Sequence, residues 1–317
     1  MSVAWRWISR FIAAGLAAYV VWFALRHLAL ESLGAAFQRP VVPAAFALAV
    51  MAYCLIYPFS GWAWQRLLGR QQVQRPVWPL VRIIALTQLA KYIPGNIAQH
   101  ASRAAMSVKQ GIGWTPYLAT AWQEALLSVT ASLVVGGLML ALSPAKMTGL
   151  PPELGLLSCA IALAVLVLCS ERPHALIADS QRLPARLLRK LGRPPGAATA
   201  TLAIGMYALN YLAVGVAIWS MAAALGLTDT VTFPLATAAF ALSWTLGFLA
   251  PGAPAGLGAR EGVMLLVLQG HGNSKELVLL VLLTRVATLT GDFIAFLAAW
   301  WLPAAAEPAS SGSTHGQ

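Results

Sequence analysis

Long apolar segments separated by short polar ones make up most of this chain of 317 residues. A helix needs about 20 apolar residues to cross the roughly 30 Å of hydrocarbon in a bilayer. Segments close to this length occur near residues 8–28, 42–64, 115–142, 154–170, 199–226 and 275–302. The pattern therefore predicts an all-α integral membrane protein with about six transmembrane helices.

Composition leads to the same fold class. Hydrophobic residues make up 59% of the chain and charged residues only 10%, and the mean hydropathy is +0.72. A soluble domain of this size could not cover so much apolar surface. The bilayer must therefore be part of the solvent of this protein.

Two of the apolar stretches are interrupted by a Pro-Gly pair. The segments on either side of each break are too short to cross the membrane at 1.5 Å per residue. Paired interruptions of this kind point to a transporter-like binding site at the membrane midplane. The hairpin breaks are predicted at Pro94 and Gly95 in the first stretch, and at Pro251, Gly252, Gly256 and Gly258 in the second.

A constant offset relates the two interrupted stretches. Residues 94 and 251 are 157 positions apart, and so are residues 103 and 260. The offset predicts one membrane domain, 1–302, built from two similar halves, about 8–142 and 154–302, each with a re-entrant hairpin. Three crossings per half would invert one half relative to the other. In the rival interpretation the interrupted stretches are ordinary spanning helices kinked by proline.

The formal charge of +11 is concentrated in particular segments. One loop contains Arg172, Arg182, Arg186, Arg189, Lys190 and Arg193 against two acidic residues. Such a loop is held on the cytoplasmic side of a membrane protein. Arg6 and Arg10 place the N-terminus on the same side, and the crossings taken in order then predict cytoplasmic N- and C-termini. The clustering of the charge in this loop argues against a nucleic-acid partner. The tail, 303–317, is rich in small residues and prolines and is expected to be disordered.

No motif in the chain supports catalysis or a metal site. Its three cysteines and five histidines lack ligand spacing, and neither a P-loop nor a nucleophile motif occurs. We therefore expect no enzymatic activity, no metal and no cofactor.

Three ionisable residues fall deep inside predicted spanning helices. Each of Glu124, Arg285 and Asp292 would cost roughly 2.5–3.5 kcal/mol at the bilayer centre, so unpaired, lipid-facing positions are disfavoured. Arg285 and Asp292 are seven residues apart and share one helix face. That face should point into the protein.

Further polar candidates lie at the two breaks. Arg103 and Arg260 each follow a break by nine residues, near the expected start of a second hairpin arm, where backbone N–H groups favour an anion. The other candidates for substrate binding are Lys91, Asn96 and Glu261. The candidate groups carry four positive and three negative charges, and the surplus of one favours an anionic headgroup.

Structural roles remain open for the same residues. Arg285 could pair with Asp292, or Glu124 with an arginine of the other half, only to hold helices together. Asn96 could satisfy broken backbone. Lys91 could extend to the membrane surface.

These stretches resemble the motifs of a known family. The sequence from Lys91 through Pro94-Gly95 to Arg103, and that from Pro251 to Arg260-Glu261, are similar to the lysylphosphatidylglycerol synthase/flippase transmembrane-region family over about residues 10–300. Ala253-Pro254-Ala255 departs from the second motif. The resemblance implies the movement of lipids between leaflets. No soluble synthase domain is expected after residue 302, so lipid aminoacylation is not expected.

The leading hypothesis is a flippase-like protein of the bacterial cytoplasmic (inner) membrane that moves an anionic phospholipid or a lipid-linked headgroup. The first alternative is an accessory protein, without transport activity, that binds a membrane enzyme of envelope lipid or glycolipid synthesis. A membrane-embedded lipid transferase is a third alternative, and the absence of a base and nucleophile pair weighs against it.

Overall fold

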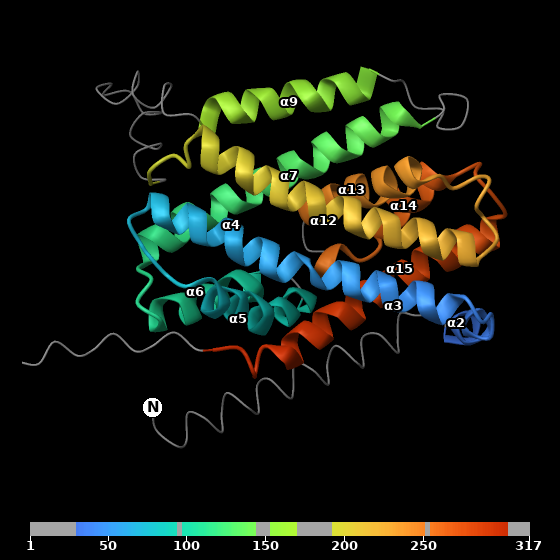
Figure 1. Ribbon diagram of the computed structural model, residues 1–317, viewed down its shortest axis with the longest axis horizontal. Coiled ribbons are helices and arrows are strands. Elements are labelled where there is room, and N and C mark those ends of the chain that lie inside the picture. The colour runs from blue at the N-terminus through green and yellow to red at the C-terminus, as the bar shows by residue number, and fades with distance from the viewer. Residues whose placement is uncertain (1–29, 94–96, 144–152, 170–191, 251–253, 304–317) are drawn as a thin grey trace, which may run out of the picture.

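The computed structural model describes residues 30–93, 97–143, 153–169, 192–250 and 254–303 (Figure 1). Helices and their connections form these ranges, which contain no β-strand. In chain order the helices are α2 (Leu30–Phe37), α3 (Val42–Cys54), α4 (Ile56–Arg70), α5 (Val77–Gln88), η1 (Leu89–Tyr92), α6 (Ile97–Lys109), α7 (Trp114–Leu142), α9 (Glu153–Cys169), α12 (Ala197–Ala224), α13 (Phe233–Leu249), η2 (Pro254–Gly256), α14 (Ala259–Leu268) and α15 (Ser274–Ala298).

Four helical segments within the described ranges are long and apolar enough to cross a membrane. They are Val42–Arg70, which joins α3 and α4, and the helices α7, α12 and α15. These segments confirm the predicted spans near 42–64, 115–142, 199–226 and 275–302. Helix α9 matches the span predicted at 154–170 in position, but its 17 residues are short for a crossing. The predicted span 8–28 lies outside the described residues.

The helices on either side of each predicted break pack against each other. Helices α5 and α6 form one pair, and α13 and α14 form the other. They contain 12, 13, 17 and 10 residues respectively, so each is shorter than a spanning helix, as predicted. Five of the hairpin-break and substrate-binding candidates lie outside the described residues: Pro94, Gly95, Asn96, Pro251 and Gly252.

The two helix pairs open toward opposite ends of the bundle (Figure 1). At the end where α5 begins and α6 finishes, Arg75 donates a hydrogen bond of 3.0 Å to the Gly111 carbonyl. Helix α12 begins near that end, where Gln71 donates to the Arg193 carbonyl at 2.8 Å, and it ends near the start of α13. The opposed arrangement fits an inverted repeat, but the re-entrant placement of both pairs in a bilayer stays a prediction.

Three groups of buried apolar residues hold the bundle together. The largest joins α3, α7, α12, α13, α14 and α15, and a second joins α4, α5, α6 and α7. The third is small and comprises Leu89, Tyr92, Ala255, Leu289 and Phe296. Since it contains residues of η1, η2 and α15, this third cluster brings the described edges of both breaks onto one face of α15.

Candidate functional site

A cavity of about 150 Å³ lies between the helix pairs. This volume is several times the roughly 30 Å³ that one water molecule occupies. Four of the residues predicted from the sequence to bind substrate, Lys91, Arg103, Glu124 and Arg260, line it together. Its other polar and aromatic lining residues are Tyr53, Tyr57, Ser60, Gln88, Gln99, His100, Ser128, Tyr207, Asn210, Tyr211, Trp244 and Phe248.

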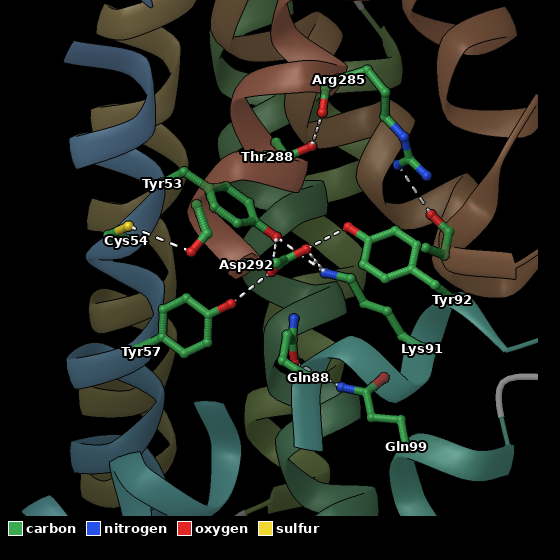
Figure 2. Close-up of polar contacts among 12 residues, drawn as sticks. Tyr53, Cys54, Tyr57, Gln88, Lys91, Tyr92, Gln99, Arg285, Thr288 and Asp292 are labelled. Atoms are coloured by element: carbon green, nitrogen blue, oxygen red, sulfur yellow. Dashed lines mark hydrogen bonds and ion pairs between the residues drawn. The ribbon is translucent and has the colours of Figure 1, made fainter. Parts of the chain in front are cut away.

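Asp292 lies behind the cavity wall as the centre of a polar network (Figure 2). Its side chain is fully buried, and Lys91 Nζ lies 2.6 Å from its Oδ2. Tyr92 donates to the same oxygen at 2.5 Å. Tyr57 and Tyr53 donate to Oδ1 at 2.6 and 3.2 Å. These contacts compensate a carboxylate that would otherwise be costly to bury.

This network bears on two structural roles considered from the sequence, one for Asp292 and one for Lys91. Asp292 pairs with Lys91 of η1, not with Arg285 of its own helix. Lys91 is only 8% exposed, so it does not extend to the membrane surface. Because Lys91 and Asp292 belong to different predicted halves, their ion pair is a direct polar link between them.

Sequence reasoning missed the tyrosines of this network. Tyr53 is the penultimate residue of α3, and Tyr57, one turn later, is the second residue of α4, so both hydroxyls face the same side of an apolar segment. The i, i+4 spacing of two hydroxyl groups in an apolar segment is a sequence signal that could have indicated a polar site on this face. Tyr92 lies within the first motif, between Lys91 and Pro94.

Arg103 forms the second ion pair of the cavity. Its NH2 nitrogen lies 2.7 Å from Glu124 Oε2, and its guanidinium lies 4.0 Å from the centre of the Trp64 ring. The expectation that Glu124 pairs with an arginine of the other half is wrong, because α6 and α7 belong to the same half. Arg103 is also the seventh residue of α6 rather than close to its start. This position leaves it beside Glu124 and away from the first-turn N–H groups.

The third ion pair joins Arg285 to Glu261, with Arg285 Nε 3.3 Å from Glu261 Oε1. Arg285 also donates to the Ala255 carbonyl at 3.3 Å. The other oxygen of Glu261 accepts from the backbone N–H of Gly258 at 2.7 Å, so the start of α14 is capped by its own chain. That N–H therefore has a partner within its own chain, while the expectation of an anion near this helix start stays a prediction.

Arg260 is the one cation of the predicted set that pairs with no carboxylate among the described residues. The other three cations are paired with Asp292, Glu124 and Glu261. The Arg260 guanidinium lies 5.8 Å from the centre of the Trp244 ring, and its buried Nε has no hydrogen-bond partner within the described ranges. The surplus positive charge counted in the sequence is thus located on Arg260, at the cavity wall.

The profile of the family described as "Lysylphosphatidylglycerol synthase TM region" matches residues 10–295. The chain belongs to the lysylphosphatidylglycerol synthase transmembrane-region family. This membership confirms the resemblance drawn from the two motifs. No individual curated protein matches the chain. For this family member, the match covers the cavity, the Asp292 network and both helix pairs.

Membership in the family supports a multi-pass membrane protein connected with lipid modification or translocation. The matched part of the family is its transmembrane region. A more specific function therefore has to be inferred from the residues that line the cavity.

Gly247 of this family member sets the position of Arg260. A Cβ atom at Gly247 would lie 2.1 Å from Arg260 Cγ, so Gly247→Ala should displace the arginine side chain without removing its charge. We expect a lower unfolding midpoint in detergent, because the added methyl group overlaps the Arg260 side chain. Gly262→Ala is the matched control, because its Cβ would meet no atom within 4 Å. Equal unfolding midpoints in the two variants would show that Gly247 does not fix the position of Arg260.

Proposed function

We propose that this protein binds the anionic headgroup of a lipid in the cavity and moves it between leaflets. The observation that carries the proposal is Arg260, a cation that borders the cavity and has no carboxylate partner among the described residues. An unpaired cation at membrane depth is costly, and a phosphate oxygen would offset that cost through charge-assisted hydrogen bonds.

The position of the cavity supports translocation rather than binding alone. It is lined by Lys91 of η1 and Arg103 of α6 on one side, and by Trp244 of α13 and Arg260 of α14 on the other. The α5/α6 and α13/α14 pairs open toward opposite ends of the bundle. A headgroup held between them could be reached from either leaflet after a small shift of one pair, while the acyl chains stay in the bilayer.

The Asp292 network is the natural element to hold the two predicted halves during such a shift. Lys91 and Tyr92 approach Asp292 from one half, and Asp292 itself lies on α15 of the other. By contrast, the Arg103–Glu124 and Arg285–Glu261 pairs each lie within one half. We therefore expect the Lys91–Asp292 pair to keep the two halves in contact while they shift.

The proposal includes the cellular setting. We place the protein in the bacterial cytoplasmic membrane with both termini in the cytoplasm, as the basic loop predicts. Its partner is then an anionic or lipid-linked headgroup, and it catalyses no covalent step.

Leaflet exchange in reconstituted vesicles tests the proposal. The purified protein would be incorporated into phosphatidylcholine vesicles that contain phosphatidylglycerol labelled with a fluorophore on its acyl chain. Dithionite bleaches only the outer-leaflet probe in protein-free vesicles. We expect the protein to make the inner-leaflet probe accessible as well. If several anionic probes, tested with and without a proton gradient, exchange no faster than in protein-free vesicles, the accessory-protein alternative replaces the proposal.

A further inference from the structure

The cavity carries more positive than negative charge. Three cationic side chains and one acidic side chain line it. Arg103 is neutralised by Glu124, and Lys91 by Asp292 behind the wall. Arg260 remains, so a cationic group that enters the cavity meets an unopposed guanidinium and no available carboxylate among the described lining residues.

Asn210 of α12 presents a hydrogen-bond acceptor to a ligand in the cavity. It is only 3% exposed and lines the same cavity. Its Oδ1 atom accepts no hydrogen bond within the described ranges. A buried acceptor without a donor is destabilising, and buried side-chain oxygens normally have a partner. A phosphodiester has only acceptor oxygens, so it cannot satisfy Asn210. A ligand that also brings a hydrogen-bond donor would satisfy this atom.

Aromatic rings complete this side of the cavity. The rings of Trp244 and Phe248 are stacked with centroids 5.3 Å apart. Tyr211 meets Trp244 edge-on at 5.6 Å. Such a wall offers flat apolar faces to the C–H groups of a polyol. In the α5/α6 pair, Gln99 donates to Gln88 at 2.8 Å, and both side chains add neutral amide groups to the lining.

We propose that the cavity recognises a phosphodiester headgroup with neutral hydroxyl groups, as in a glycerol, inositol or sugar headgroup. The phosphate accepts from Arg260, and a hydroxyl donates to Asn210 Oδ1. A headgroup that carries an aminoacyl ammonium is rejected, because it would place positive charge near Arg260. The inference rests on the site of the proposed function and names its substrate class.

Native mass spectrometry of the purified full-length protein tests this specificity with lipids of identical acyl chains. Phosphatidylglycerol has the negative charge and the hydroxyls, whereas phosphatidylmethanol has the same charge without them. Lysylphosphatidylglycerol keeps one hydroxyl but is cationic overall. We expect phosphatidylglycerol to bind roughly two- to tenfold more tightly than phosphatidylmethanol, the ratio that one hydrogen bond supplies. Lysylphosphatidylglycerol should bind most weakly.

Asn210→Leu should still bind both phosphatidylglycerol and phosphatidylmethanol, but with equal affinity. The wild-type series decides the question even where this variant fails to fold. Equal wild-type binding of phosphatidylglycerol and phosphatidylmethanol would overturn the inference, as would preferred binding of lysylphosphatidylglycerol. The expected ranking without any leaflet exchange in vesicles would instead contradict only the transport proposal.

Discussion

Replacing Arg260 by alanine should lower lipid exchange by roughly ten- to hundredfold without lowering the thermal stability of the protein. The loss corresponds to one charge-assisted interaction with a phosphate. Stability should stay constant or rise, because the variant removes a buried cation that pairs with no carboxylate among the described residues. Exchange in vesicles and the unfolding midpoint in detergent, measured on the same preparation, check both parts. Arg260→Lys should restore activity only in part, since an ammonium group cannot form two parallel hydrogen bonds to a phosphate.

Arg103→Ala provides the contrast. Arg103 lines the same cavity but is held by Glu124 at 2.7 Å, so its removal leaves a carboxylate alone in a largely buried position. That variant should lose stability as well as activity. If Arg260→Ala destabilises the protein as much as Arg103→Ala does, Arg260 has a structural role and the proposed anion site is wrong.

The largest expected effect on stability belongs to Asp292→Asn. The change removes the charge that compensates Lys91, whose side chain is 10% exposed beside a fully buried partner. Breaking a buried ion pair from one side costs about 3–5 kcal/mol. We therefore expect a strongly lowered unfolding midpoint in detergent and slower lipid exchange. Asp229→Asn, at an exposed position in the turn before α13, is the matched control and should change neither quantity.

A double variant separates the ion pair from the rest of the network. Lys91→Met combined with Asp292→Asn leaves no unpaired charge, so it should be more stable than Asp292→Asn alone. Additive losses in the double variant would mean that Lys91 and Asp292 do not stabilise each other.

The sequence by itself determined the membrane environment and most helix positions. A spanning helix needs an apolar run of about 20 residues, and this requirement placed α7 and α12 within two residues of their observed bounds. Helix pairs flank both breaks because proline and glycine interrupt helices locally. The net charge of the candidate site was also readable, since it depends only on which residues are present.

Only the tertiary structure decided which charges neutralise one another. Asp292 and Arg285 share a helix face, yet Asp292 pairs with Lys91, 201 positions away in the sequence. An ion pair depends on the distance between its two groups in space, and helix periodicity fixes only the direction of a side chain. Packing of η1 and η2 on α15 brings Lys91 to Asp292 and Arg285 to Glu261, and it leaves the surplus cation on Arg260 at the cavity.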